Sequence, residues 1–259
     1  MPSVRLDRFI SERTEYTRSQ IKQLAAKGSI TVNGIVIKKS DTKIDTEKDS
    51  VTVCGQTLSE SRCRYFLVNK PEGYVCSTDE KDGVTVLNLI PPELRTKGLF
   101  PAGRLDKDST GALLITDDGE LAHRMLSPKR HISKIYIVKL DRPFESKYVN
   151  EFEKGMILAN GDVCRSAKVR CSPDCETVAF VELYEGKYHQ VRRMFAAVGN
   201  HVQFLQRISL GSLILPEKLS LGMYMELLHK DVENLFVPLD FDIFFTENAS
   251  FFSANLINK

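Results

Sequence analysis

The sequence contains no long apolar run. No stretch approaches the ~18 uncharged apolar residues that a membrane-spanning helix needs. The first seven residues already include Arg5 and Asp7, where a signal peptide would have its apolar core. We therefore expect a cytoplasmic protein that does not enter a membrane. The 259 residues, 42% hydrophobic and 27% charged, have the composition of a globular protein.

Cysteine is also scarce. Six cysteines are spread over a chain that is large enough to fold without disulfides, so we expect reduced thiols. Cys171 and Cys175 have C-x3-C spacing, but Ser172-Pro173-Asp174 between them is typical of a turn joining two strands. No second Cys or His pair follows at the spacing of a zinc finger, and we expect no metal.

The phosphate-binding glycine motifs are missing. Neither G-x-x-x-x-G-K-[ST] nor G-x-G-x-x-G occurs, which argues against a nucleotide-dependent enzyme. We expect no nucleotide and no other cofactor. The positive charge is small but uneven: the net charge is +2, while residues 217–259 carry seven acidic against three basic residues. The rest of the chain is therefore moderately basic, which favours an anionic partner.

Residues 1–60 are predicted to form a small basic domain. Helices are expected at 6–11 and 18–27, the second capped by Thr17 and ended at Gly28. Asn33-Gly34 between two β-rich runs indicates a hairpin, and a further strand is expected at 50–53. Residues 1–39 contain eight bases and three acids, which suits a phosphate backbone, although charged helices also simply keep a surface hydrated.

A second domain is expected after a polar linker at 59–64, spanning 61–238. Strands are predicted at 65–68, 112–116, 134–140, 178–184 and 201–205, and helices at 120–125, 147–154 and 189–198. The irregular order lacks a βαβ repeat and favours an α+β fold with a mixed or antiparallel sheet. Residues 239–259 form a C-terminal extension with five phenylalanines, which we expect to pack on this domain; an oligomer contact is the alternative.

The segment from Gly103 to Gly119 is the most informative part of the chain. A charged loop with Asp106 and Asp108 leads into a β-rich strand, a geometry that holds a carboxylate at the edge of a rigid sheet. Paired carboxylates would suit a glycosidase, but residues two apart in an extended loop point in opposite directions. Taken alone, Asp106, Asp108, Asp117 and Asp118 are each best explained as turn-capping residues.

Two families resemble this chain. Arg5–Ile10, Thr17–Gln20 and Gly28–Gly34 resemble the S4 RNA-binding domain over residues 3–58. The segment 103–119, together with 69–78, 134–138 and 185–195, resembles the pseudouridine synthases, in the branch that carries an S4 domain. The tracts 74–78 and 187–200 are most similar to the members that act on small-subunit (16S) rRNA.

The resemblance implies a reaction and roles for single residues. Uridine becomes pseudouridine when the N1 glycosidic bond breaks, the base turns and the bond re-forms through C5. One carboxylate, Asp106, would attack C1′ or take a proton from C2′. Because the base must leave its stack, Arg104 is expected to fill the gap and Tyr136 to stack on the uracil. A surface arginine and an ordinary strand tyrosine are the plain alternatives.

Further contacts are implied in the same way. Arg192 is expected to form an ion pair with Asp106 and to keep it ionised. Lys134, Lys187, His189 and Arg193 are candidates for substrate contact in the catalytic domain, and His189 is also a candidate helix cap. The candidates for phosphate contact in the S4 domain are Arg18, Lys22 and Lys39.

We therefore expect a monomeric, site-specific rRNA pseudouridine synthase that acts on 16S rRNA or an assembling small-subunit particle. The same activity on 23S rRNA is one alternative. A non-catalytic RNA-binding ribosome-assembly factor is another, and the combination of Asp106, Tyr136 and Arg192 argues against it.

Overall fold

The computed structural model describes residues 3–11, 13–14, 16–46, 48–58, 63–127 and 132–257. The chain divides into two compact units, Met1–Arg62 and Cys63–Lys259. Residues 59–62, most of the expected linker, lie outside the described residues. Among the helices of the described part, none combines the length and the apolar character needed to cross a bilayer.

The N-terminal unit is a small α+β module. Its elements are β1 (Ser3–Arg5), α1 (Leu6–Ser11), α2 (Arg18–Ala26), β2 (Ile30–Val32), β3 (Ile35–Val36), β4 (Lys43–Asp45), β5 (Val51–Val53) and β6 (Gln56–Leu58). β1 pairs with β4, and the other strands form a sheet in the order β3-β2-β5-β6. Leu6, Phe9, Ile10, Ile21 and Ile30 lie in the core that joins helices and sheet.

Local signals determine two features of this unit. Thr17 and Gln20 form a capping box at the start of α2, as each side chain binds the backbone of the other. Asn33 and Gly34 have φ values of 52° and 78°, which a two-residue turn between β2 and β3 requires. Both predicted helices and the predicted hairpin are confirmed.

The C-terminal unit is built on one nine-stranded mixed sheet. Its path is β13-β14-β10-β15-β9-β7-β17, with β8 also paired to β9 and β16 to β15. The strand bounds are β7 (Tyr65–Lys70), β8 (Phe100–Ala102), β9 (Thr110–Thr116), β10 (Lys134–Leu140), β13 (Lys168–Cys171), β14 (Val178–Leu183), β15 (Val202–Leu210), β16 (Leu213–Ile214) and β17 (Tyr224–Glu226). The predicted α+β class with a mixed sheet is confirmed.

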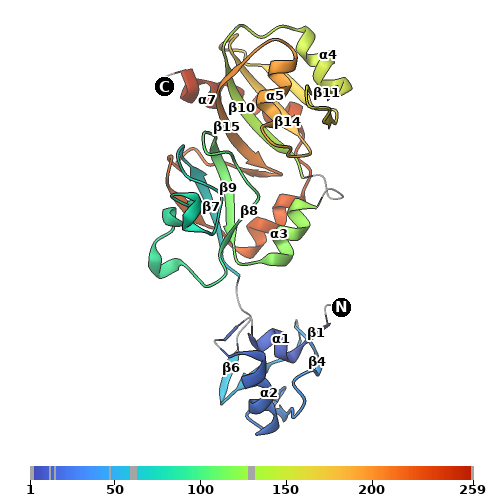
Figure 1. The fold of residues 1–259 in the computed structure, drawn as a ribbon, viewed down its shortest axis with the longest axis vertical. Coiled ribbons are helices and arrows are strands. Elements are labelled where there is room, and N and C mark those ends of the chain that lie inside the picture. Colours follow the sequence, from blue (N-terminus) through green and yellow to red (C-terminus); the bar gives the residue numbers. More distant parts are fainter. Residues whose placement is uncertain are drawn as a thin grey trace. The chain divides into compact units, whose positions relative to one another are not determined.

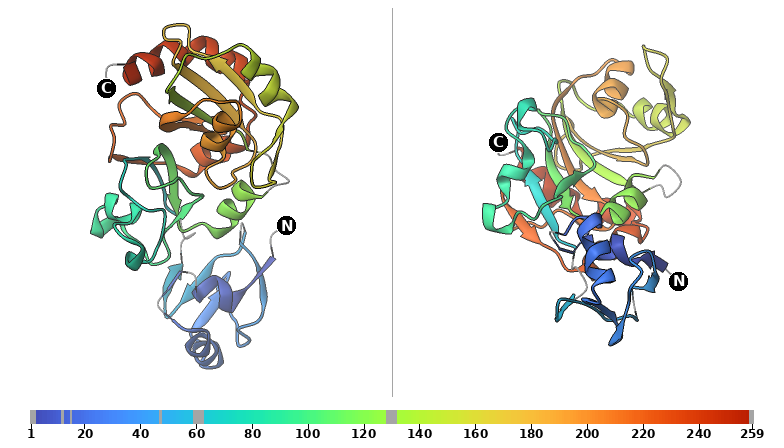
Figure 2. Two further views of the ribbon diagram at one scale, coloured as in Figure 1. Left: turned by 45° about the horizontal axis from the view of Figure 1, so that its top comes forward. Right: turned by 60° about the horizontal axis from the view of Figure 1, so that its bottom comes forward.

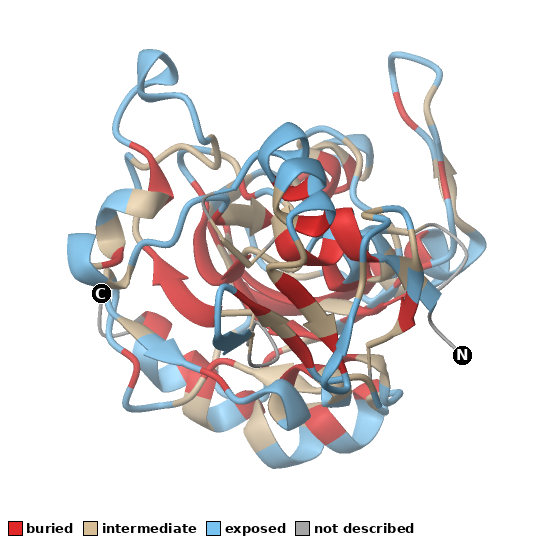
Figure 3. Cartoon of the chain, turned by 90° about the horizontal axis from the view of Figure 1, so that it is seen from below, coloured by how far each residue is buried: buried red, intermediate tan, exposed pale blue. Residues whose placement is uncertain are grey.

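The remaining elements are helices, one small hairpin and short turns. They are α3 (Gly119–Leu126), α4 (Lys147–Lys154), α5 (Gln190–Ala197), α6 (His229–Glu233), α7 (Phe241–Ile257), the hairpin β11 (Met156–Ile157) and β12 (Val163–Cys164), and four short 3₁₀ turns, at Glu80–Asp82, Val86–Leu89, Pro92–Leu94 and Asn234–Phe236. α4 contacts β13, α5 contacts β15 and α3 contacts β8, and Figure 1 shows α3 beside β8. The strands of the sheet are mostly buried (Figure 3).

Two halves of the sheet meet at one parallel pair of strands. β9 and β15 share only two register pairs, Gln206 with Thr110 and Arg207 with Gly111, and every other pairing in the sheet is antiparallel. Gly111 lies at the closest point of approach: a Cβ there would lie 2.1 Å from the carbonyl oxygen of Arg207. The loop that carries Asp106 enters β9 at this seam.

The C-terminal extension forms α7 and packs on the sheet. Ile135 and Ile137 of β10 contact one apolar cluster together with Phe241, Phe244 and Phe252 of α7. Tyr136 and Val138 of β10 belong to another cluster, which includes α5. α5 and α7 therefore cover opposite faces of the same strands (Figure 2).

Candidate active site

Asp106 lies in a tight turn just before β9. The turn is closed by a hydrogen bond from the Ser109 amide to the Asp106 carbonyl oxygen at 3.1 Å. The fully buried ammonium of Lys70, at the end of β7, donates to the carbonyl oxygens of Ser109 at 2.7 Å, Asp106 at 3.0 Å and Pro71 at 3.1 Å. Burial lowers the pKa of Lys70, but these carbonyl dipoles solvate its charge, so the lysine holds the turn in place.

The Asp106 side chain borders a pocket of about 240 Å³. The turn before β9 contributes Asp106, β10 contributes Tyr136, and the start of α5 contributes His189. The other lining residues are Arg104, Leu105, Ser109, Leu183, Gly186, Lys187, Tyr188, Gln190, Val191 and Leu205. This "Asp106 pocket" combines one carboxylate, one aromatic side chain and apolar walls, which suits a flipped base with its ribose beside the carboxylate.

Tyr136 forms one wall of the pocket. Its side chain is 8% exposed and lies in register with Val181 of β14 and Arg207 of β15. A strand in the centre of a sheet fixes the ring, so its face is available to a planar ligand at little cost in conformational entropy.

His189 is closer to Asp106 than the sequence indicated. Its Nε2 atom lies 3.6 Å from an Asp106 carboxylate oxygen, and its ring stacks on Tyr188 with centroids 3.9 Å apart. His189 occupies the N-cap position of α5 with a left-handed backbone, φ 47° and ψ 35°, and its side chain makes no capping hydrogen bond. His189 is therefore at the predicted cap position, but its side chain does not cap the helix. The imidazole lines the Asp106 pocket instead.

The expected ion pair between Arg192 and Asp106 is wrong. Arg192 Nη2 lies 2.9 Å from the carboxylate of Asp108, and its Nη1 donates to the carbonyl oxygen of Val202 at 2.9 Å. The tight turn is the reason: Asp106 faces the pocket, while Asp108, two residues on, faces the helix that carries Arg192. Asp108 is therefore more than a turn cap, and Arg192 holds the turn through the Asp108 carboxylate, whereas Lys70 holds it through carbonyl oxygens.

The other predicted contacts are distributed as follows. Arg104 is exposed and borders the Asp106 pocket, and Lys187 lines it while its ammonium donates to the Val163 carbonyl oxygen at 2.7 Å. Arg193 forms an ion pair with Asp162 at 2.9 Å. The S4 candidates, Arg18, Lys22 and Lys39, are all exposed in the N-terminal unit.

Asp117 and Asp118, which the sequence predicted to cap a turn, both make local structural contacts. Asp118 accepts a hydrogen bond from the Leu121 amide at 2.8 Å and caps α3. Asp117 accepts from the Arg64 amide at 2.7 Å. Neither lines the Asp106 pocket.

Two buried cations in this region carried no clear sequence signal. Lys70 is in the recognised Asn69-Lys70-Pro71 run, but nothing in that run shows that its ammonium reaches the Asp106 turn. Arg207 stands in a β-rich segment and is 2% exposed, although arginine is rarely buried. The burial of each of these two side chains depends on contacts between segments that are distant in the sequence.

Lys134, at the start of β10, carries a charge that folding makes costly. Burial, and next the charge of Arg207, lower its pKa from 10.5 to about 8. The Lys134 ammonium therefore binds its proton more tightly in the unfolded chain than in the folded protein. Below pH ~8 the lysine is charged in both states, and the cost of burying that charge lowers the unfolding free energy by its full amount. As the pH rises from about 8 to about 10.5, this penalty disappears.

We accordingly expect the Lys134→Met protein to exceed the wild type in unfolding free energy at pH 7, and this advantage to shrink towards pH 10. Urea titrations at both pH values measure it. Lys139→Met, on the same strand, is the matched control for loss of a lysine. An advantage that stayed constant across this range would contradict the assignment.

Comparisons with known proteins identify the family of this chain. The family model described as RNA pseudouridylate synthase matches residues 64–197, and the S4 domain model matches residues 4–51. The Escherichia coli (strain K12) protein named ribosomal small subunit pseudouridine synthase A is 38% identical over 90% of this chain and 100% of its own. The Bacillus subtilis protein named uncharacterized RNA pseudouridine synthase YtzG is 35% identical over 91% and 99%, respectively.

A solved structure supports the same assignment. The crystal structure of a pseudouridylate synthase, 37% identical in sequence, superimposes with a TM-score of 0.63 and covers 90% of this chain and 99% of its own. The family match, the two relatives and this structure agree with one another on the family. The chain belongs to the RNA pseudouridylate synthase family and is an S4-domain-containing RNA pseudouridine synthase.

Proposed function

We propose that this enzyme isomerises one uridine of small-subunit (16S) rRNA. The observation that carries the choice of RNA is the match to the E. coli protein named ribosomal small subunit pseudouridine synthase A, which extends over that protein's whole length. The enzyme is further proposed to act in the cytoplasm as a monomer, with 1–60 as the RNA-binding domain, 61–238 as the catalytic domain and 239–259 as an extension.

The proposed catalytic group is the carboxylate of Asp106. Asp106 lines the same pocket as Tyr136, so its carboxylate can reach C1′ or the C2′ proton of a ribose whose base has entered beside Tyr136. The Tyr136 ring stacks on the uracil and keeps it in the pocket while the glycosidic bond is broken. Breaking the N1 bond, turning the base and bonding C5 consumes no other reactant.

The surrounding residues are proposed to position this group. Lys70 and Arg192 clamp the two sides of the turn, through its carbonyl oxygens and through Asp108. His189, 3.6 Å from Asp106, and Lys187 contact the ribose or its phosphate. Arg104, exposed at the rim, fills the space that the flipped base leaves. Arg193 contributes to binding only if RNA displaces Asp162.

The choice of RNA is tested with transcripts. Wild-type enzyme is incubated with small-subunit and large-subunit rRNA that carry tritium at uracil C5, with and without the matching ribosomal proteins. We expect release of tritium to water from small-subunit RNA only. Release from large-subunit RNA alone would show that the protein is a pseudouridine synthase but that the proposed RNA is wrong. RNA binding without tritium release from any of these RNAs would favour the non-catalytic ribosome-assembly factor.

The S4 residues give a separate prediction. Replacing Arg18, Lys22 and Lys39 with Gln should raise KM for rRNA and change kcat little, because these exposed cations belong to the N-terminal unit and do not line the Asp106 pocket. The slope of log K against log salt should become shallower by about 2–3 if each cation meets one phosphate.

A matched triple replacement removes the same charge elsewhere. Lys81, Lys147 and Lys154 are exposed in the C-terminal unit and line neither the Asp106 pocket nor its neighbour. Changing these three to Gln should leave the salt slope within about 1 of the wild type. Equal losses in both triples would show that only net charge matters.

A further inference from the structure

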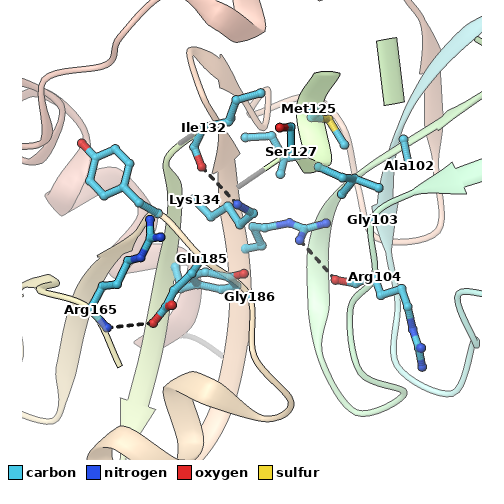
Figure 4. Close-up of a pocket in the computed structure, with 15 residues that line it drawn as sticks. Ala102, Gly103, Arg104, Met125, Ser127, Ile132, Lys134, Arg165, Glu185 and Gly186 are labelled. Carbon is cyan, nitrogen blue, oxygen red and sulfur yellow. Dashed lines mark hydrogen bonds between the residues drawn. The ribbon is translucent and has the colours of Figure 1, made fainter. Parts of the chain in front are cut away.

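A second pocket adjoins the Asp106 pocket. Its volume is about 480 Å³, and it shares Arg104, Tyr136 and Gly186 with its neighbour. The other lining residues are Ala102, Gly103, Met125, Leu126, Ser127, Ile132, Lys134, Arg165, Tyr184, Glu185, Arg207 and Leu210 (Figure 4). Because the two pockets share three lining residues, an RNA chain whose target base lies in the first pocket reaches the second with a neighbouring nucleotide.

Two cations lie in the wall of this second pocket. Arg207 donates from Nε to the Ala112 carbonyl oxygen at 2.7 Å and from Nη1 to the Arg104 carbonyl oxygen at 3.3 Å. Its Nη2 is buried and has no hydrogen-bond partner within the described part of the chain. Lys134 donates to the Ile132 carbonyl oxygen at 3.0 Å, which leaves ammonium protons unused. Figure 4 shows the Lys134 ammonium pointing towards Ile132 inside the pocket.

No carboxylate in the described residues forms an ion pair with either cation. Glu185 also lines the pocket, but its carboxylate already accepts from Gln190 Nε2 at 2.6 Å and from the Arg165 amide at 3.0 Å. The charge of Glu185 acts on Lys134 without forming an ion pair, so the repulsion between the two cations is only partly compensated. Their repulsion is removed when an anion binds between them.

We propose that the second pocket binds a backbone phosphate of the substrate RNA, at one of the two phosphodiester linkages that flank the target uridine. This inference rests on the proposed function. A phosphodiester supplies one negative charge and acceptor oxygens for both a guanidinium and an ammonium. The apolar side chains of Met125, Leu126 and Leu210 lower the local polarity and strengthen that contact.

The phosphate contact has a structural consequence for the chemistry. Arg207 is hydrogen-bonded to Ala112 in β9 and to the backbone of Arg104, on either side of the Asp106 turn. A phosphate held by Arg207 therefore fixes the sugar-phosphate chain relative to the same turn that carries the carboxylate. The binding energy of the phosphate positions the ribose against Asp106.

The test uses a short RNA containing the mapped target uridine, with one neutral methylphosphonate at the linkage on its 5′ side, on its 3′ side or at a distant control position. Tritium release gives kcat/KM for wild type and for Lys134→Met. At one flanking linkage, the neutral group should lower kcat/KM of the wild type about tenfold or more, and that of the variant less than about twofold. The control linkage should show no such difference.

Arg207→Met is measured in the same way, but Arg207 also supports the fold, so the linkage scan in wild type and Lys134→Met decides the matter. Equal losses in wild type and variant, or no loss at either flanking linkage, would overturn the phosphate site. In that case an abasic nucleotide beside the target that costs more than the neutral linkage would assign the pocket to a base. Failure of the proposed function is separate: wild type would then release no tritium from the unmodified RNA.

Discussion

We expect the Asp106→Asn enzyme to lose at least about 10⁴-fold in the rate of tritium release, since an amide can neither attack C1′ nor accept the C2′ proton. Asparagine keeps the size of the side chain. The backbone of the turn stays clamped by Lys70 through its carbonyl oxygens, which the change does not touch. RNA binding and thermal unfolding of the variant should therefore match the wild type.

Asp108→Asn is the matched control, because it makes the same chemical change two residues away. Asp108 faces Arg192 and not the pocket, so we expect its loss to reduce turnover by about 10-fold or less, through a looser turn. A large loss in Asp108→Asn with activity retained in Asp106→Asn would reverse the two roles.

The second large effect concerns stability and the seam of the sheet. Gly111→Ala should destabilise the C-terminal unit by about 3 kcal/mol or more, because the new Cβ meets the Arg207 backbone and the backbone φ of 106° suits only glycine. For a unit of this size that corresponds to a fall in Tm of about 6–12 °C. Since β9 follows the Asp106 turn, activity should fall as well.

Gly119→Ala provides the comparison for Gly111→Ala. Gly119 is the first residue of α3, and an added Cβ there meets no atom within 4 Å. Alanine favours a helix over glycine by up to about 1 kcal/mol, so this variant should be as stable as the wild type or slightly more stable. If the Gly111→Ala protein had the same Tm as the Gly119→Ala protein, the close approach of β9 and β15 would be contradicted.

Features that depend on neighbours in the sequence were predictable. The capped helix at 18–26, the Asn33-Gly34 turn and the strand at 134–140 follow from local composition, and the structure reproduces them. The parallel joining of β9 to β15 depends on residues 96 positions apart. No local pattern specifies which strands meet in this way.

The active site shows the same division. The motif that carries Asp106 and the strand that carries Tyr136 are recognisable in the sequence, and both side chains line one pocket. The partner of Arg192 depends on how a four-residue turn is folded, which decides between Asp106 and Asp108. The buried roles of Lys70 and Arg207 arise from contacts with carbonyl groups of distant segments, and carbonyl groups have no sequence signature.

In the phenylalanine-rich extension, the amino-acid composition predicted burial but not the type of secondary structure. Its phenylalanines predicted packing on the catalytic domain, and Phe241, Phe244 and Phe252 do pack there. The helical form of residues 241–257 was not predicted, because apolar residues occur on much of its circumference and give little periodicity.

One measurement decides whether the enzyme modifies a single small-subunit uridine through Asp106. Small-subunit and large-subunit rRNA, each treated with wild type or Asp106→Asn, are labelled with a carbodiimide that marks pseudouridine and are then read by primer extension. We predict one new stop, in small-subunit RNA treated with wild type, and none in RNA treated with the variant. A stop that persists with Asp106→Asn, or no stop in small-subunit RNA with either protein, would contradict the proposed enzyme.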